Sequence, residues 1–341
     1  MAGRVTKVLQ QNIQDACAIY NADCVEVARK LPDDSIHYTI FSPPFIALYT
    51  FSDSDRDMSN CASDNTFWDH FKFLIAELYR VTKPGRLCTI HLMQLPTSKL
   101  RDGFIGLKDF RGDVIRSFQD KGFIYHSEVC IWKDPVVAMQ RTKSIGLLHK
   151  QIVKDSSMSR MGVADYMVTL RKPGDNAEPV AGPFDAYYGS EAAPDGQLVT
   201  ETGKMRTSNT PGDPWYSVAV WQRYASPVWM DINQSDVLSH KVARAEADER
   251  HISPLQLTPI RRCIQLWTNP GDTVFSPFAG IGSELYVALE LGRNALGAEL
   301  KTSYYEQALA NIATLKQHRQ PDLFDFGDNA GAALDELDET A

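Results

Sequence analysis

Apolar and polar positions along the first 132 residues predict a repeating order of strands and helices. Runs rich in β-branched and aromatic residues indicate buried strands, whereas apolar residues spaced three and four apart indicate helices. In chain order, the predicted elements are a strand at 16–20, a helix at 25–31, a strand at 36–40, a helix at 66–81, a strand at 86–92, a helix at 114–121 and a strand at 123–132. This alternation favours a doubly wound, mainly parallel α/β sheet.

A second patterned region follows a long irregular stretch. Residues 134–250 contain several Pro-Gly turns and few periodic runs. From 269 onward the chain reads as a turn, a strand, a glycine loop, a helix at 284–291 and a strand at 294–299 that ends in an acid. This is the layout of a nucleotide-binding βαβ unit.

The glycine loop of this unit reads F-A-G-I-G at 278–282, and the acid at the end of the second strand is Glu299. Glycines let the backbone approach a ligand closely, and a carboxylate can accept hydrogen bonds from the two hydroxyls of a ribose. The loop lacks the G-x-G-x-x-G spacing that holds a pyrophosphate. An adenosine without phosphates therefore fits it better.

A stiff turn, Ser42-Pro43-Pro44-Phe45, follows the predicted strand at 36–40. Proline has no N–H to donate, so two consecutive prolines end the strand. The turn presents a hydroxyl, backbone carbonyls and an aromatic face in one place, which suits a flat ring carrying an amino group. Taken alone, the same residues also fit an ordinary proline turn.

Together, the S-P-P-F turn and the F-A-G-I-G loop resemble the motifs of the amino-methylating DNA methyltransferases. Their order, turn first and loop last, is that of the permuted β group, and the resemblance covers most of residues 20–132 and 249–315. It implies a class I methyltransferase fold (Rossmann-like), circularly permuted, with an inserted target-recognition region and with S-adenosylmethionine as cofactor. It assigns catalysis to Ser42, Pro43, Pro44 and Phe45, and cofactor binding to Phe278, Gly280, Gly282 and Glu299.

The same resemblance implies four further cofactor-binding residues. Asp23 matches an acid that faces the adenine amino group, although Asp23 can also simply cap the helix at 25–31. His251 and Ser253 match a segment that holds the methionine end, and Tyr304 begins the last helix as in the family. Ser253-Pro254 is also expected to start a helix that runs to Trp267. Three positions depart from the family pattern: Leu255, Ser276 and Lys301.

These patterns divide the chain into a catalytic half at 1–133, a target-recognition region at 134–248, a cofactor-binding half at 249–318 and an acidic tail at 319–341. Seven acids and no Lys or Arg occur within 322–341, so the tail supplies −7 of the net charge of −8. We expect such a tail to be disordered and solvated. Its use as a DNA mimic over a basic groove is the alternative.

A basic stretch lies within the predicted recognition region. Between 141 and 172, seven basic residues are opposed by two acids, a local balance of +5. Contacts to DNA phosphates need such a patch, whereas a solvated loop face is the alternative. The candidate DNA-binding residues are Arg141, Lys143, Lys150, Lys154 and Arg160.

Several classes of protein are disfavoured. No run approaches eighteen apolar residues, and the N-terminus lacks an apolar signal core, so neither a membrane span nor a signal peptide is expected. Six cysteines without a C-x-x-C pair disfavour structural zinc and disulfides and suit a reducing cytoplasm. Asp53, Asp55 and Asp57 alternate as in a calcium loop, but Met58 stands where that loop needs glycine, so no metal is expected. A monomer or homodimer is expected.

The sequence therefore predicts a site-specific methyltransferase acting on an exocyclic amino group of double-stranded DNA, with the target base flipped out of the helix. Cytosine N4 is favoured because serine at the first position of the turn is commoner in the cytosine N4 enzymes. Adenine N6 is the alternative. A non-catalytic, methyltransferase-like DNA-binding subunit is a further one. The C5-cytosine enzymes are disfavoured because no cysteine stands in their Pro-Cys setting.

Overall fold

A computed structural model of the protein provides its fold. The structure describes residues 8–44, 58, 64–97, 99–142, 148–159, 161–181, 199–210, 212–213, 215–239 and 254–319. Among these residues, no helix combines the length and the apolar character needed to cross a bilayer.

The fold is organised around a nine-stranded sheet. Its strands, in spatial order, are β1 (Gln10–Gln14), β2 (Cys17–Asn21), β11 (Asn294–Glu299), β10 (Thr273–Ser276), β3 (Ile36–Phe41), β4 (Thr82–Met93), β8 (Asp165–Arg171), β7 (Ile124–Ile131) and β9 (Val228–Trp229). The five strands from β2 to β4 are mutually parallel, whereas β8 runs antiparallel to both of its neighbours. The predicted mainly parallel sheet is confirmed.

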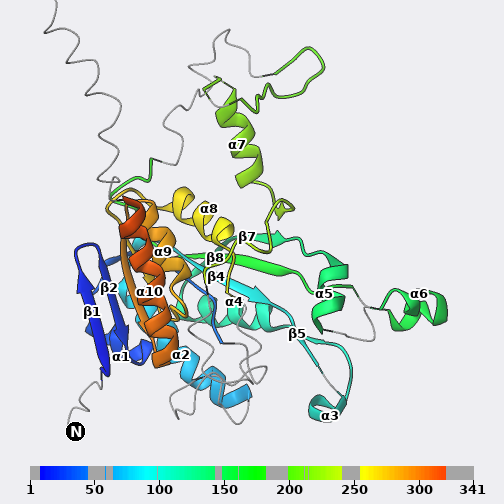
Figure 1. Ribbon diagram of the computed structural model, residues 1–341, viewed down its shortest axis with the longest axis horizontal. Helices are drawn as coiled ribbons and strands as arrows, with labels where there is room; N and C mark the ends of the chain where they lie inside the picture. Colours follow the sequence, from blue (N-terminus) through cyan, green and yellow to red (C-terminus); the bar gives the residue numbers. More distant parts are fainter. Residues whose placement is uncertain are drawn as a thin grey trace, which may run out of the picture.

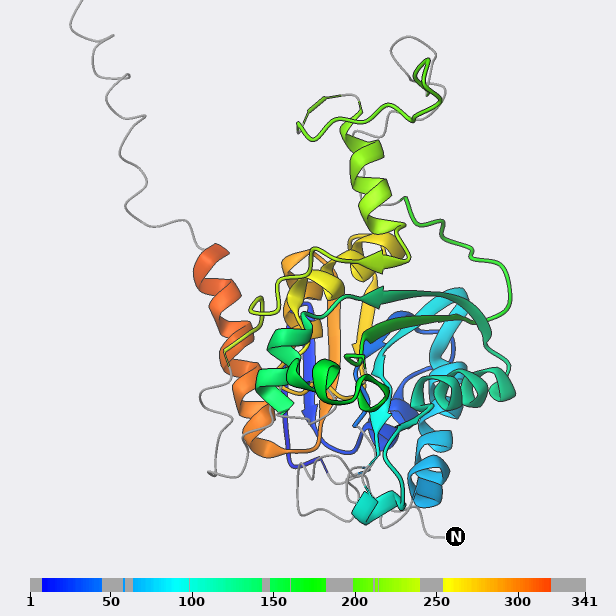
Figure 2. The ribbon, with the colours of Figure 1, turned by 90° about the vertical axis from the view of Figure 1, so that its right-hand side faces the viewer.

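Helices cover both faces of the sheet, which is the doubly wound arrangement. One face packs against α1 (Cys24–Lys30), α2 (Asp64–Val81) and α4 (Phe110–Lys121). The other packs against α8 (Leu257–Trp267), α9 (Ser283–Glu290) and α10 (Thr302–Arg319). Figure 2 shows the sheet between these two layers, with the orange α10 on one side and the cyan α2 on the other.

The remaining elements lie at the periphery (Figure 1). They are β5 (Leu95–Pro96), α3 (Lys99–Asp102), β6 (Leu107–Lys108), α5 (Pro135–Thr142), α6 (Lys150–Lys154), the 3-10 helix η3 (Ser156–Met158) and α7 (Tyr216–Tyr224). Helix α7 stands away from the sheet in both views. Most of these peripheral elements come from the predicted recognition region.

Two strands within the predicted recognition region at 134–248, β8 and β9, belong to the central sheet. Strand β8 lies within that range, yet it is a full member of the central sheet, paired with β4 on one side and β7 on the other. Its C-terminal end lies beside the start of β4, where Lys172 Nζ donates to Asp34 Oδ1 at 2.6 Å and to the Thr82 carbonyl at 2.7 Å. Lys172 therefore belongs to the packing of the sheet rather than to a basic patch.

The predicted start of α8 at Ser253-Pro254 is wrong. The helix begins at Leu257, with Gln256 as N-cap and no cap from the side chain of Gln256. Its first amides are satisfied by Asp236, which accepts from Leu257 N at its carbonyl and from Thr258 N at Oδ2. A cap supplied by a residue about twenty positions earlier leaves no local signature in the sequence.

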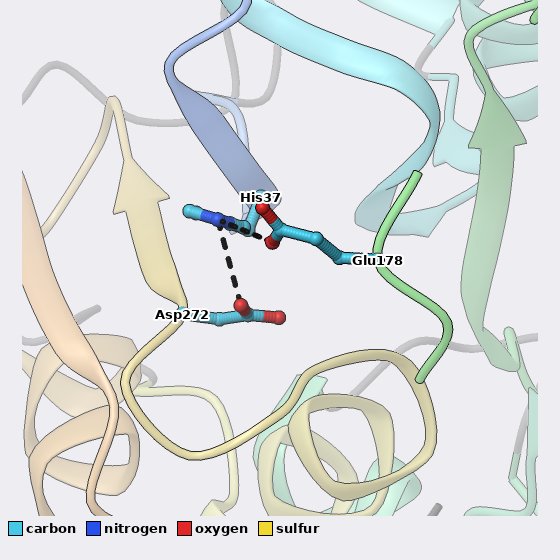
Figure 3. Close-up of side chains that lie close together, drawn as sticks. All are labelled: His37, Glu178 and Asp272. Carbon is cyan, nitrogen blue, oxygen red and sulfur yellow. Dashed lines mark ion pairs between the residues drawn. The ribbon is translucent and has the colours of Figure 1, made fainter. Parts of the chain in front are cut away.

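A buried polar cluster joins the N-terminal ends of three strands, and part of it is shown in Figure 3. Arg86 of β4 donates to Asp272 Oδ2 at 2.7 Å, and the two side chains are only 2% and 7% exposed. His37 of β3 lies 3.5 Å from Asp272 through Nε2 and accepts the backbone N–H of Thr273 at Nδ1. The cluster therefore connects β3, β4 and β10 at the end of the sheet where these three strands begin.

We expect Asp272→Asn to lower the free energy of unfolding by about 3–5 kcal/mol, because it leaves the buried Arg86 guanidinium without a counter-charge. Urea denaturation followed by circular dichroism measures the change. The matched control is Glu290→Gln, which removes an ion pair between Arg261 and Glu290 that is about one-third exposed and should cost less than about 1 kcal/mol. Equal losses in the two variants would contradict a special role for the buried pair.

Candidate functional site

The S-P-P turn and the glycine loop leave the sheet side by side. Strands β3 and β10 are parallel neighbours, with Tyr38 opposite Val274 and Thr39 opposite Phe275. Their C-terminal ends lie where the connections turn to opposite faces of the sheet, the switch point at which open α/β sheets bind ligands. The rings of Phe41, just before the turn, and Phe278, in the loop, are 5.7 Å apart. The structure thus brings together the two predicted motifs.

The carboxylate of Glu299 is held in place by backbone amides on both of its oxygens. Gly280 N donates to Oε2 and Lys301 N donates to Oε1, each at 2.8 Å. Each carboxylate oxygen can accept more than one hydrogen bond, so Glu299 retains acceptor capacity for ligand hydroxyls. Its orientation next to the glycine loop suits the predicted ribose contact.

The two glycines of the loop have different surroundings. Both have positive φ, +53° at Gly280 and +87° at Gly282. A Cβ added to Gly282 would lie 3.0 Å from the Ala308 side chain of α10, whereas a Cβ added to Gly280 would meet nothing within 4 Å. Gly282 therefore allows close helix packing. Gly280 borders open space beside Glu299, as expected where a backbone approaches a nucleoside.

Two more of the predicted cofactor residues are in the described part of the chain. Asp23 caps α1, because its Oδ1 accepts from Val25 N at 2.9 Å and Glu26 N at 3.0 Å. The capping alternative is therefore confirmed, and Oδ2 forms no hydrogen bond within the described part of the chain. Tyr304 lies in the first turn of α10, where the Lys301 ammonium is 4.5 Å from the centre of its ring.

Glu284, a residue that the sequence analysis did not single out, follows the loop in the first turn of α9. It is 4% exposed. Burial, together with the nearby charge of Glu299, raises the pKa of Glu284 to about 8. The carboxyl group is therefore mostly protonated at neutral pH. Ser276, which replaces the acid of the family pattern, is also buried, and its Oγ has no hydrogen-bond partner among the described residues.

Ser42 of the S-P-P turn is hydrogen-bonded to His91 of β4, with Oγ and Nδ1 3.0 Å apart. His91 Nε2 lies 3.1 Å from Asp165 Oδ2, and Lys133 Nζ lies 2.5 Å from the same oxygen. The sequence analysis missed all three partners. One feature of the sequence could have indicated His91: it is a polar residue near the end of a predicted strand, and that strand neighbours the one before the S-P-P turn. Nothing local pointed to Asp165, which was counted only as an acid opposing the basic stretch.

Several predicted residues lie outside the described residues: Phe45, Lys143, Arg160, His251 and Ser253. Arg141 is in α5, and Lys150 and Lys154 begin and end α6 with exposed side chains. Helix α6 lies on the opposite side of the molecule from β1 and β2 (Figure 1).

One cluster in the described part of the chain has the composition of a metal site. Ligand atoms of His37, Glu178 and Asp272 lie within 4.8 Å of one another (Figure 3). Burial lowers the pKa of His37, so the ring is neutral, and Nδ1 accepts the Thr273 N–H. Nε2 must then carry the ring proton and has no lone pair for a cation. This cluster is a structural hydrogen-bond network at the N-terminal ends of the strands, whereas Ser42 lies beyond the C-terminal end of β3.

Comparisons with known proteins agree with this architecture. A family model described as DNA methylase matches residues 36–310. The type II methyltransferase M.MjaI of Methanocaldococcus jannaschii is 25% identical over 232 residues, covering 67% of this chain and 61% of the relative. M.BamHI of Bacillus amyloliquefaciens is 22% identical over 84% of this chain and 55% of its own. The chain therefore spans less than two-thirds of the length of either relative.

Solved structures share the fold. A Thermus thermophilus protein complexed with S-adenosyl-L-methionine aligns with a TM-score of 0.56 and 21% identity, covering 86% of this chain and 91% of that one. The cytosine-N4-specific PvuII DNA methyltransferase aligns with a TM-score of 0.53 and 13% identity over 90% of both chains. The prediction of a class I methyltransferase fold is confirmed.

We expect Gly280→Ala to weaken binding of S-adenosylhomocysteine at least tenfold, because its Cβ would project into the open space beside Glu299. Isothermal titration calorimetry measures the affinity. Gly271→Ala is the matched control, since Gly271 also has positive φ (+82°) and open surroundings but precedes β10 at the other end of the sheet. Each variant should lose about 1–2 kcal/mol of stability from the left-handed backbone. Equal affinity in the two variants would remove Gly280 from the cofactor site.

Proposed function

Since the chain belongs to the DNA methylase family, we propose that it transfers a methyl group from S-adenosylmethionine to an exocyclic amino nitrogen of a base in double-stranded DNA, with cytosine N4 as the target. The observation that carries the proposal is the position of Ser42-Pro43-Pro44 beside the glycine loop at the switch point of the sheet. A methyl donor and an amino acceptor bound at these two motifs would meet beyond the C-terminal ends of β3 and β10.

The proposed cofactor site is formed by residues around β10, β11 and β2. Glu299 would accept the ribose hydroxyls, and Gly280 would let the backbone lie against the nucleoside. Asp23, through Oδ2, would accept from the adenine amino group, while Phe278 and Tyr304 would line the site. His251 and Ser253 are proposed for the methionine end on the family resemblance alone. When bound, the cofactor supplies an electrophilic methyl group on a sulfonium.

The proposed acceptor site is the S-P-P turn. The amino group of a flipped base would donate to Ser42 Oγ and to the Pro43 carbonyl, and Phe45 would stack on the ring. These two hydrogen bonds would draw the nitrogen toward a tetrahedral geometry, in which its lone pair can attack the methyl carbon. Holding donor and acceptor in line supplies much of the rate.

Cytosine N4 and adenine N6 remain the two candidate targets. The preference for cytosine rests on the serine at the first position of the turn, which is an argument from family resemblance. A non-catalytic role is disfavoured by the geometry of the site, because Ser42 has a hydrogen-bonded histidine and Glu299 is oriented by two amides. Nucleoside analysis of methylated DNA distinguishes all three.

We expect Ser42→Ala to reduce the single-turnover rate of methyl transfer by roughly 30- to 1000-fold, the loss of about 2–4 kcal/mol of transition-state hydrogen bonding. The measurement uses labelled S-adenosylmethionine and unmethylated plasmid DNA, followed by nucleoside analysis; S-adenosylhomocysteine affinity should change far less. Ser35→Ala is the matched control, because Ser35 precedes the same strand at its other end and its hydroxyl donates to the Pro32 carbonyl. A parent-like rate in Ser42→Ala would refute the proposed acceptor site.

The DNA-binding role of the basic stretch is a separate proposal. In the described chain it rests on Lys150 and Lys154, which are both exposed on α6. We expect the double variant Lys150→Ala, Lys154→Ala to flatten the slope of log affinity against log salt by about two at most, one for each lost phosphate contact. Fluorescence anisotropy with labelled duplex DNA measures the slope. Lys30→Ala, Lys121→Ala serves as the control for net charge, and identical slopes in both doubles would mean that α6 is only a solvated face.

A further inference from the structure

Four chain segments contribute to a line of polar side chains behind the catalytic turn. Ser42 follows β3, His91 is near the end of β4, Asp165 begins β8 and Lys133 follows β7. The contacts run from Ser42 Oγ to His91 Nδ1 at 3.0 Å, from His91 Nε2 to Asp165 Oδ2 at 3.1 Å and from Asp165 Oδ2 to Lys133 Nζ at 2.5 Å. Because β8 runs antiparallel to β4, its first residue lies beside the C-terminal end of β4.

This line of side chains is buried at a cost in solvation. The side chains of His91 and Asp165 are 11% and 5% exposed. Asp165 Oδ1 and His91 Nε2 are both buried without a hydrogen bond of good geometry among the described residues, and Nε2 lies 3.1 Å from Asp165 Oδ2. Burial alone would raise the pKa of Asp165, but His91 and Lys133 together hold it below its usual value. An ionised carboxylate is thus kept beside an imidazole in a nearly dry setting, where charge interactions are strong.

The order of the contacts determines which nitrogen of His91 carries the proton. An ionised Asp165 can only accept, so the ring places its N–H at Nε2. Nδ1 then holds the lone pair and accepts the hydroxyl proton of Ser42. Ser42 Oγ consequently has its own lone pairs directed away from His91 and available to an N–H donor. This is the Ser-His-Asp arrangement that makes a serine oxygen basic in other enzymes.

We propose that Ser42, His91 and Asp165 form a proton relay that removes the proton released by the target amino group. The proposal rests on the proposed function, in which Ser42 Oγ meets that amino group. The amino nitrogen forms its bond to the methyl carbon, the electrons of the breaking C–S bond remain on sulfur, and the nitrogen becomes positively charged. It then loses one proton to Ser42 Oγ as the serine's own proton passes to His91 Nδ1. Asp165 stabilises the resulting imidazolium, which later releases its proton to water.

A protonated serine hydroxyl is not stable near neutral pH, so Ser42 can take this proton only if its own proton passes to another acceptor, which is His91. His91 acts through Ser42 and is therefore a positioning residue with a proton-accepting role. Lys133 keeps Asp165 ionised and, as a cation, also opposes protonation of His91. The relay predicts that methyl transfer slows as pH falls and His91 becomes protonated before the reaction.

Among the described residues, His91 is the imidazole in contact with both Ser42 and Asp165. Other titratable and charged groups on the surrounding elements include Tyr38 on β3, Arg262 and Cys263 on α8, Cys130 and Glu128 on β7, Tyr166 on β8 and Arg111 on α4. His37 on β3 and His126 on β7 are further histidines on these strands, and burial lowers the pKa of both. Burial raises the pKa values of Tyr38, Cys263, Cys130 and Tyr166, so all four stay neutral below pH 8. Arg262 pairs with Asp231, and Arg111 pairs with Glu128.

The first test is the pH dependence of the single-turnover rate, measured from pH 5 to 9 with labelled S-adenosylmethionine and unmethylated plasmid DNA. In the parent protein we expect the rate to fall on the acid side. His91→Gln should reduce the rate by roughly 10²- to 10⁴-fold, as expected for loss of a general base, and should abolish the acid limb. Glutamine can accept the hydrogen bond of Ser42 but cannot take its proton.

The second test is Lys133→Met, which leaves Ser42, His91 and Asp165 in place. Removing a cation beside the relay favours the protonated imidazole, so the acid limb should move to higher pH. His37→Gln is the matched control. His37 is also a neutral histidine beside a buried carboxylate, but it lies at the N-terminal end of β3, at the other end of the strand from Ser42. Its substitution should therefore leave the acid limb unchanged.

The outcomes separate the relay from the reaction itself. If Ser42→Ala is slow while His91→Gln keeps the parent's rate and acid limb, the relay is wrong and the acceptor site stands. If Ser42→Ala also keeps the parent's rate, the proposed acceptor site fails with it. If His91→Gln does not fold, Lys133→Met decides, because an acid limb at the parent's pH in that variant overturns the relay.

Discussion

The parallel pairing of β3 with β10 is the constraint on which the rest of the structure depends. The two strands come from opposite ends of the chain, and their pairing places the S-P-P turn beside the glycine loop. Contacts at both ends of the two strands support the pairing. At the N-terminal ends, a buried polar cluster is formed by Arg86, Asp272 and His37. Beyond the C-terminal ends, the rings of Phe41 and Phe278 are in contact. A shift of this register by one residue would separate the two motifs and expose the cluster.

The two ends of the central strands use buried charge in different ways. At the N-terminal ends of β3, β4 and β10, the polar contacts of Asp272 hold the strands together, and His37 is neutral with its proton at Nε2. At the C-terminal ends of the parallel strands, the surroundings shift the pKa values of two carboxyl groups in opposite directions. Glu284 is raised to about 8 by burial, whereas Asp165 is kept ionised by His91 and Lys133.

Strand β8 links the central sheet to the region expected to contact DNA. It comes after α5 and α6 in the chain, yet it lies between β4 and β7 and contributes Asp165 to the line of side chains behind Ser42. Helices α5 and α6 are therefore flanked in the chain by β7 and β8, and the adjoining ends of these strands carry Lys133 and Asp165.

The sequence by itself determined the local elements and the two motifs, because each is specified by residues within a short stretch. The strand β11 at 294–299, the helix α2 and the S-P-P turn follow from periodicity, glycine and proline, and the doubly wound α/β sheet follows from their order. The class I methyltransferase fold was implied by the family resemblance of the two motifs. Asp23 could be identified as a helix cap for the same reason. Only the tertiary structure decided that Asp236 caps α8, that β8 enters the sheet and that Asp165 meets His91. These partners are far apart in the chain, and their contacts arise from strand order and packing, which no local pattern of residues specifies.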